Sequence, residues 1–378
     1  MKTKLFNSVL MVVALLTALP ANAYDFMDNG LCYKINQDGV SVSVTYETNY
    51  STPPTYSNLS GNISIPDKVT YNGASYPVTE IDFYSFRGCT DVTGVSIPSS
   101  ITDIRGYAFM GCTGLTDVTI PDNVTFIGGF LFSGCTNLKN VTLPNKITRI
   151  CSNTFNGCTN LTSVVIPESV TLIEEWAFAN CSCLTSIIIP SSVTAIAKST
   201  FTNCTSLTGV TTPDLAKWCG IYFGDKSANP LYNAHHLYCN GAEVQDLDIP
   251  EGTTRINAFA FAGGTNLTTL TIPTSVTAVG QQSFLGCKSL NKIYCKRPRP
   301  VSASSDAFEG VDTETCVLYV PKESEQMWWV ADVWKEFVYI EAWGNGNDPN
   351  PTLRGDVNGD GIVNGADVTA LYEILLEQ

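Results

Sequence analysis

The sequence has few charged side chains and very few groups suited to catalysis. Charged residues make up 15% of the 378 positions, and 35 Asp and Glu outnumber 21 Lys and Arg to give a net charge of −14. Because phosphate groups are bound by basic surfaces, this balance argues against nucleic acid or an anionic membrane as a partner. Only two histidines occur, and the motifs of serine hydrolases, zinc proteases and phosphate-binding loops are missing. We therefore expect a protein that is not an enzyme.

Long apolar runs are missing after the first residues. Residues 1–23 pass from two lysines through an apolar stretch at 9–19 to small residues that end at Ala23, which are the three parts of a secretory signal peptide. The apolar stretch is shorter than the ~20 residues that a membrane-spanning helix needs. We expect cleavage after Ala23, a secreted or cell-surface protein, and no membrane insertion after cleavage.

The sequence does contain a strict period of 23 residues. Within it a phenylalanine is followed three positions later by a cysteine, and a proline recurs at the same interval. A unit this short cannot bury an apolar face by itself, so the period predicts copies stacked into a solenoid. The regular units carry Phe86, Phe109, Phe132, Phe155, Phe178 and Phe201, with Cys89, Cys112, Cys135, Cys158, Cys181 and Cys204, and with Pro98, Pro121, Pro144, Pro167, Pro190 and Pro213.

Each unit contains three local patterns. The alternation Leu-x-x-Val-x-Ile predicts a short strand with one buried face, which proline ends because it cannot donate a ladder hydrogen bond. A Val-Thr-x-Ile segment predicts a second extended piece, and the stretch Ala-Phe-x-Gly-Cys-Thr predicts a single helical or 3₁₀ turn. Two more units are centred on Phe261 and Phe284, and a degenerate last unit is centred on Phe308.

Fourteen cysteines would suggest disulfides in a secreted chain. Those at the fixed repeat position, including Cys287, are better explained as buried free thiols. Stacked strands lie ~4.8 Å apart, which exceeds the ~3.5–4.5 Å that a disulfide prefers between β-carbons. Gly264 also takes the place of the cysteine in one unit. Outside the row, Cys219 and Cys239 flank one irregular segment and form the most plausible bridge.

That irregular segment interrupts the period. Pro213 and Pro250 lie 37 positions apart, which places an insertion at about 214–236. The insertion is rich in aromatic residues, and we expect part of them to pack onto the array and the rest to form a ligand-binding patch. Its two adjacent histidines point in different directions on an extended chain, so a zinc site is not expected. The candidate ligand-binding residues are Trp218, Tyr222, Tyr232, His235 and Tyr238.

Both ends of the array need covers, because an exposed solenoid end can pair with other chains. Residues 24–64 lie outside the period and alternate from Val40 to Tyr46, which predicts a β-rich N-terminal cap. At the other end an aromatic cluster follows the last unit. We interpret it as a terminal plug, with a sugar-binding platform as the alternative. The cluster comprises Met327, Trp328, Trp329, Val330, Val333, Trp334 and Phe337.

The C-terminal tail has a different composition. Residues 341–353 are rich in Gly, Asn and Pro, which is typical of a linker. In residues 354–378, oxygen-bearing side chains occupy positions 1, 3, 5 and 12 of an EF-hand-type calcium loop, with Gly361 at the sharp bend. A linker rich in Asp and Asn that binds no calcium is the alternative. The predicted Ca²⁺ ligands are Asp356, Asn358, Asp360, the carbonyl group of Ile362, and Asp367.

The repeat units resemble the BspA-like leucine-rich repeats over residues 65–340, as the segment SIPSSITDIRGYAFMGCTGLTDVTIP illustrates. This resemblance implies a solenoid of stacked short parallel β-strands with short helical turns. It also implies a secreted or surface-exposed bacterial protein, because members of that family are secreted or lie on the cell surface. Several members are similar to adhesins that bind matrix proteins such as fibronectin and fibrinogen. The expected function is therefore adhesin-like, non-catalytic binding of extracellular or host proteins.

Residues 354–378 resemble one half of a type I dockerin, whose calcium loops end in Asp and lead into a helix. That family carries two such segments in tandem, and this sequence contains one. A complete dockerin implies a cohesin-type partner on a scaffold. One alternative function is therefore a dockerin-bearing carbohydrate-active enzyme, which turnover of polysaccharides would distinguish from adhesion. Another is a scaffold-assembled component, which is tested by whether calcium alone makes residues 354–378 structured.

Overall fold

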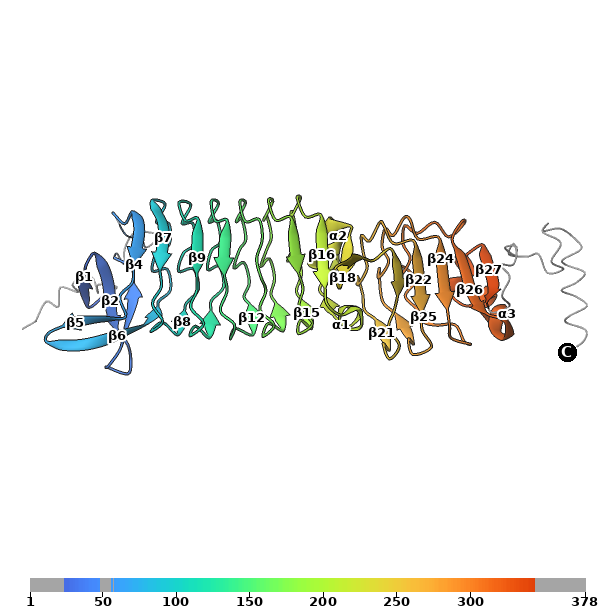
Figure 1. The fold of residues 1–378 in the computed structure, drawn as a ribbon, viewed down its shortest axis with the longest axis horizontal. Coiled ribbons are helices and arrows are strands. Elements are labelled where there is room, and N and C mark those ends of the chain that lie inside the picture. The colour runs from blue at the N-terminus through green and yellow to red at the C-terminus, as the bar shows by residue number, and fades with distance from the viewer. Residues whose placement is uncertain (1–23, 48–55, 57, 344–378) are drawn as a thin grey trace, which may run out of the picture.

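The repeated apolar positions fold into a β-solenoid in which successive 23-residue units form successive coils (Figure 1). The computed structural model describes residues 24–343 except 48–55 and 57. About 11 coils are stacked along one long axis, with short parallel strands on two sides of the stack. The fold class predicted from the sequence is confirmed.

The first row of strands comes from the Leu-x-x-Val-x-Ile segments. Val118 pairs in register with Val95 and Val141, so like side chains of successive coils form buried rows. The alternate positions face outward, as the period of two requires. The strands of this first row are β4 (Gly61–Ser64), β7 (Val92–Ser96), β9 (Asp117–Thr119), β11 (Asn140–Thr142), β14 (Ser186–Ile188), β16 (Gly209–Thr212), β18 (Leu237–Cys239), β20 (Asp246–Asp248), β22 (Thr269–Ile272), β24 (Lys292–Cys295), β26 (Val317–Pro321) and β27 (Tyr339–Trp343).

The second row of strands comes from the Val-Thr-x-Ile segments. Ile104 pairs with Ile81 and Ile127, so an isoleucine from each of these coils faces the core. The strands of this second row are β6 (Ala74–Ile81), β8 (Asp103–Ile104), β10 (Phe126–Ile127), β12 (Arg149–Ile150), β13 (Leu172–Ile173), β15 (Ala195–Ile196), β17 (Tyr222–Phe223), β21 (Arg255–Ile256), β23 (Ala278–Val279) and β25 (Ser302–Ala303).

The N-terminal cap extends the second row. β1 and β2 are antiparallel, β2 and β3 are antiparallel, and β3 pairs in parallel with β6, which forms a hairpin with β5. The β-rich cap expected for residues 24–64 is present, although β4, within that range, pairs with β7 and already belongs to the first row. The cap strands are β1 (Phe26–Asp28), β2 (Leu31–Ile35), β3 (Val42–Thr45) and β5 (Lys68–Tyr71).

The segment expected to form a helical turn forms consecutive reverse turns instead. Alternate amides donate to the next coil, from Tyr107 to Gly129 at 3.0 Å and from Phe109 to Leu131 at 3.1 Å, so they are not free to make helical hydrogen bonds. The amide of Met110 closes a turn by donating to the carbonyl of Tyr107 at 3.1 Å. Tyr107 itself has a φ of 62°, a left-handed conformation that recurs at the equivalent residue of neighbouring coils.

A row of phenylalanine rings fills the interior. From Phe86 to Phe201 the centroids of neighbouring rings lie 5.2–5.8 Å apart, and the ring planes are tilted by 17° or less. A second stack runs from Phe261 through Phe284 to Phe308. These spacings fall in the range of favourable offset stacking. Each ring therefore completes the burial of the rings in the coils on either side.

The repeat cysteines are buried free thiols, as predicted. The thiol of Cys112 donates to the carbonyl of Phe86 at 2.9 Å, and equivalent bonds of 3.0–3.3 Å follow in later coils. Burial raises the pKa of Cys135 to about 12, because a thiolate is poorly solvated in the core. These thiols therefore stay protonated and link each coil to the phenylalanine of the preceding coil.

Aromatic residues close the C-terminal end, as expected for a plug. Trp334 and Phe337 meet the ring of Phe308 edge-on at 5.3 and 5.4 Å, and Trp328 meets Trp334 at 5.2 Å. All of these rings are buried, so they serve as packing groups and not as a sugar platform. Residues 341–343, predicted as the start of the linker, belong to the last strand, β27. The short helices around the plug are η2 (Lys322–Ser324), α3 (Glu325–Val330) and η3 (Trp334–Glu336).

The phenylalanine row gives a stability prediction. Replacing Phe155 by Ala should lower the free energy of unfolding by about 3–5 kcal/mol, because it removes a fully buried ring and leaves a cavity between two others. Urea unfolding followed by circular dichroism measures the change. Thr142→Ala is the control, because its exposed side chain should contribute no more than about 0.5 kcal/mol. Equal effects of the two substitutions would show that the ring row is not the core.

The buried thiols give a reactivity prediction. Alkylation of the native protein at pH ~8 should modify the exposed Cys183 first and the partly exposed Cys239 more slowly, because the thiolate is the reactive form. The repeat cysteines should react only after unfolding. Mass spectrometry of the peptides identifies the modified residues. Modification of Cys135 at the rate of Cys183 would contradict the buried thiol row.

Candidate functional site

The insertion is folded into the stack. Asp214 caps α1 (Leu215–Cys219), since its Oδ1 accepts from the amides of Ala216 at 2.8 Å and Lys217 at 3.0 Å. The chain then adds β17 to the second row, passes through two short helices and adds β18 to the first row. The insertion is therefore one enlarged coil. Its helices are η1 (Lys226–Ala228) and α2 (Leu231–Ala234), and β18 is followed by the hairpin strand β19 (Ala242–Glu243).

Polar contacts, of which those of Trp218 and Asn229 are buried, attach the enlarged coil to the coil that follows. Both rows of strands are interrupted there, so side chains supply hydrogen bonds in place of a strand ladder. Asn229 Nδ2 and Trp218 Nε1 donate to the carbonyl of Ala260 at 3.0 and 2.7 Å. His235 Nδ1 lies 2.9 Å from the carbonyl oxygen of Gly263. These residues connect the two halves of the solenoid.

The predicted ligand-binding residues do not form one patch. Trp218 is fully buried, which removes it from the candidate surface, and His235 is engaged in the contact between coils. The ring of Tyr232 is partly buried and faces the ammonium group of a neighbouring lysine, 5.2 Å from the ring centre. Tyr222 and Tyr238 remain accessible, but they lie on β17 and β18 and therefore in different rows.

The expected disulfide between Cys219 and Cys239 is wrong, since both are free thiols. Cys219 ends α1 with its side chain in the core, where burial raises its pKa to about 12. Cys239 ends β18 and is partly exposed. The two residues flank the insertion in the sequence, but its fold places them on different elements with different surroundings.

Exposed apolar side chains gather on the outer face of the first row. Val165 is 75% exposed and Ile188 is 53% exposed, at the outward position that Thr142 occupies in an earlier coil. From Ile188 the strand register runs through Thr211 to Tyr238. We refer to Val165, Ile188 and Tyr238 as the first-row patch. The sequence reasoning identified Tyr238 and missed the two aliphatic residues, which replace threonine in the repeat.

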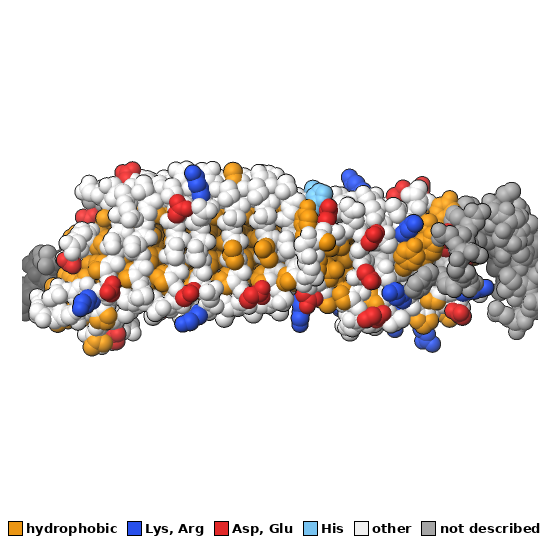
Figure 2. Space-filling model, in the orientation of Figure 1, with side chains coloured by type: hydrophobic (Ala, Val, Ile, Leu, Met, Phe, Trp, Pro, Cys, Tyr) orange, Lys and Arg blue, Asp and Glu red, His pale blue; other side chains and the backbone are white. Residues whose placement is uncertain are grey.

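A hydrogen-bonded histidine borders the first-row patch. His236 Nδ1 lies 2.5 Å from Glu243 Oε1, and Asn266 Nδ2 donates to the same oxygen at 2.5 Å. Gly209 leaves space for the ring of Tyr238, because a β-carbon at Gly209 would lie 3.0 Å from it. Figure 2 shows histidine beside acidic and hydrophobic side chains on this part of the surface. The patch therefore has an apolar centre and a polar edge.

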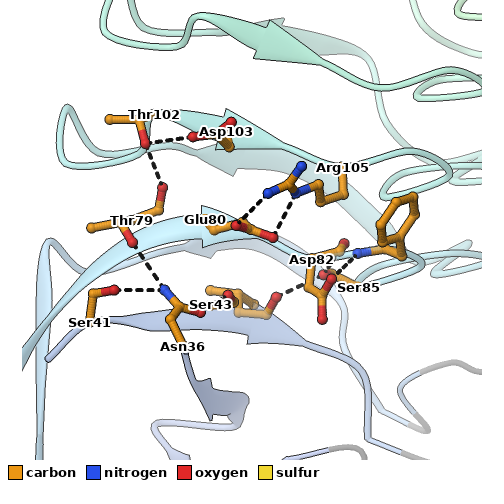
Figure 3. Close-up of polar contacts among 12 residues, drawn as sticks. Asn36, Ser41, Ser43, Thr79, Glu80, Asp82, Ser85, Thr102, Asp103 and Arg105 are labelled. Atoms are coloured by element: carbon orange, nitrogen blue, oxygen red, sulfur yellow. Dashed lines mark hydrogen bonds and ion pairs between the residues drawn. The ribbon is translucent and has the colours of Figure 1, made fainter. Parts of the chain in front are cut away.

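A second candidate site is a polar groove of about 530 Å³ between the N-terminal cap and the first coils. It lies on the outer face of the second row, where Ser43 of β3 pairs with Glu80 of β6. Asn36 donates to the hydroxyl groups of Ser41 at 2.8 Å and Thr79 at 3.2 Å, and it accepts from Ser43 (Figure 3). No sequence pattern indicated this groove, because it joins residues 34–43 to residues 79–105.

An ion pair and a partly buried acid form the other wall of the polar groove. Arg105 Nε and Nη2 donate to the two carboxylate oxygens of Glu80 at 2.8 and 3.1 Å, which raises the pKa of Arg105 (Figure 3). Burial raises the pKa of the Asp82 carboxyl group above its ordinary value. With Asp38 and Lys34, the lining holds more acidic than basic groups. Such a lining disfavours anionic ligands.

The predicted calcium ligands Asp356, Asn358, Asp360, Ile362 and Asp367 lie outside the described residues, as do the signal segment at 1–23 and the tail from 344 onward. Within the described part of the chain, no cluster of three or more His, Cys, Asp or Glu side chains is placed to hold a metal ion. No helix among those same residues combines the length and apolar character needed to cross a bilayer.

Comparison with known proteins agrees with the repeat architecture. The model of the BspA type leucine-rich repeat region matches residues 79–208 and 234–320, which is more than half of the chain, in 6 copies. No curated protein matches the chain.

Solved structures that are similar to this chain include several leucine-rich repeat proteins. A leucine-rich repeat protein from Bacteroides ovatus is 22% identical, covering 85% of this chain and 100% of its own, with a TM-score of 0.36. A leucine-rich cell surface protein from Faecalibacterium prausnitzii is 23% identical, covering 88% and 96%, with a TM-score of 0.43. The pneumococcal vaccine antigen PcpA is 16% identical, covering 80% and 83%, with a TM-score of 0.40.

Proposed function

Because the chain belongs to the BspA-type leucine-rich repeat family, we propose that it is a secreted or cell-surface, adhesin-like protein that binds extracellular proteins without catalysing a reaction. The signal-like segment at 1–23 supports export. The observation that carries the binding role is the first-row patch. Val165 and Ile188 expose apolar side chains at a repeat position that holds threonine, Thr142, in an earlier coil. The fold of the coil therefore does not require an apolar residue there.

The surroundings of the first-row patch also support a protein partner. Ile188 on β14 and Tyr238 on β18 are joined through β16 by parallel strand pairing, which holds their backbones in place and limits the conformational entropy lost on binding. Tyr238 adds an aromatic ring, and the bonded pair of His236 and Glu243 supplies a polar edge. An apolar centre with aromatic residues and a polar rim is typical of protein interfaces.

Binding is favoured over glycoside hydrolysis for a chemical reason. Hydrolysis of a glycosidic bond requires two carboxyl groups that face each other across the substrate and titrate separately. In the polar groove, both carboxylate oxygens of Glu80 are engaged by Arg105. Asp38 is engaged by the hydroxyl group of Ser41 and by the amides of Val40 and Ser41. Asp82 is therefore left without a second carboxyl group free to act with it across a substrate. The dockerin-bearing enzyme therefore remains the less favoured alternative.

The binding proposal predicts the effect of restoring threonine to the first-row patch. The double substitution Val165→Thr and Ile188→Thr should keep the fold, because both side chains are exposed and threonine occupies the equivalent site at 142. It should weaken capture of purified fibronectin or fibrinogen by about tenfold or more. Surface plasmon resonance on a panel of matrix proteins measures the effect.

Tyr222→Ala is the matched control, since Tyr222 is 64% exposed but lies in the second row. It should bind like the wild type. Point substitutions are preferable to removal of the insertion, because Asn229 and Trp218 hold the following coil in place. Loss of binding in Tyr222→Ala with retention in the double variant would place the interface on the second row and overturn the proposal.

We also propose that residues 354–378 bind one Ca²⁺ through the five predicted ligands, as the spacing of their oxygens suggests. Isothermal titration of the full chain should detect one calcium site, and Asp360→Ala should weaken it by at least about tenfold, because it removes a charged ligand. Glu377→Gln is the control, since it changes the charge of the same segment outside the loop. Titration without calcium uptake would refute the metal assignment.

A further inference from the structure

The polar groove belongs to a longer track on the outer face of the second row. Register places Ser43, Glu80, Asp103 and Phe126 side by side on successive strands β3, β6, β8 and β10. Beyond Phe126 a second hollow of about 320 Å³ lies between β10 and β12. The track therefore crosses several neighbouring strands, which are spaced ~4.8 Å apart. An elongated ligand could lie along it.

The polar side chains of the track are held in place before any ligand binds. Asn36 is fixed by three hydroxyl groups, and Glu80 is fixed by both nitrogen donors of Arg105 (Figure 3). Asp38 accepts from the hydroxyl of Ser41 at 2.6 Å. Groups fixed in this way lose little rotamer freedom on binding. The groove therefore presents its polar groups in a fixed arrangement.

The chemistry of the lining favours hydroxyl groups. The carboxylates of Asp38, Glu80 and Asp82 offer mainly acceptors, whereas Lys34 and Arg105 supply donors at the side. A hydroxyl group both donates and accepts, so it can use either kind of neighbour. A peptide backbone would need an open strand edge, but β3 and β6 are paired on both sides.

Phe126 supplies an apolar surface within the polar track. Its ring is 39% exposed and occupies an outward strand position, and the guanidinium group of Arg105 lies 5.9 Å from its centre. The ring is not needed for the core, where Ile127 of the same strand is buried. A flat apolar ring beside fixed polar groups suits the C–H face of a pyranose ring, whose hydroxyl groups point outward from its edge.

We propose that this track, from the polar groove across Arg105 to Phe126, is a binding site for a neutral polysaccharide chain. Sugar units would place hydroxyl groups against Glu80 and Asp82 and one pyranose face on Phe126. The advance per sugar unit of an extended glycan is close to the spacing between strands, so successive units meet successive coils. This proposal does not depend on protein binding by the first-row patch, which lies on the other row.

A glycan array followed by isothermal titration tests the proposal on the full chain. The probes are neutral oligosaccharides of six or more units, such as glucans, mannans and xylans. We expect the wild type to bind at least one of them. Phe126→Ala and Asp82→Asn should each weaken that binding by about tenfold. Asp82→Asn should fold normally, because the amide oxygen can still accept the hydrogen bond from the Phe83 amide.

Tyr222→Ala is the matched control, because it removes another exposed ring at the same outward position of the same row. It should leave glycan binding unchanged, as should the double variant of Val165 and Ile188. Failure to bind any neutral glycan would overturn the proposal. Equal affinity of wild type and Phe126→Ala would do the same. Binding of oligolysine in place of glycans would identify the track as a site for basic peptides and also reject it.

Discussion

The stacking of each coil on the next is the physical constraint on which the whole molecule depends. A 23-residue unit has too little surface to bury its own apolar side chains, so each phenylalanine ring is covered by the rings of its neighbours. The main chain has the same need, since amides such as that of Phe109 find acceptors only on the following coil. The thiol of Cys112 adds a side-chain link in the opposite direction. The 23-residue period of the sequence, the register of the strands and the burial of the core therefore all depend on the same stacking of coils.

Wherever stacking cannot continue, the structure uses aromatic residues and side-chain hydrogen bonds. At the C-terminal end, Trp334 and Phe337 cover the last ring of the row, Phe308. At the insertion, Asn229 and Trp218 donate to carbonyl groups that a regular coil would have paired with main-chain amides. Residues that looked like a recognition patch in the sequence are thus partly explained by the need to close these interruptions.

The residues on the surface are not constrained by packing in the way that the core residues are. Outward strand positions are free of the packing constraint, and on the first row several coils carry threonine there, as at Thr119, Thr142 and Thr211. Departures from that pattern are therefore informative, because stability does not require them. The aliphatic pair Val165 and Ile188 departs from it. On the second row the outward position of Phe126 varies from coil to coil, with Asp103 on the neighbouring strand, and Phe126 lies close to a lining with an excess of acids.

The sequence by itself determined the solenoid, its two kinds of strand, the buried thiols and the aromatic plug, because these features follow from a fixed period and from local alternation. It did not predict the reverse turns around Tyr107, since the amides there are directed by the next coil and not by local propensity. It also could not reveal that Trp218 is buried or that Cys219 and Cys239 stay apart, because the path of the insertion depends on contacts with the coils on both sides. The polar groove was decided by the tertiary structure alone. Its walls, Asn36 and Arg105, meet only because strand pairing brings the cap and the first coils together.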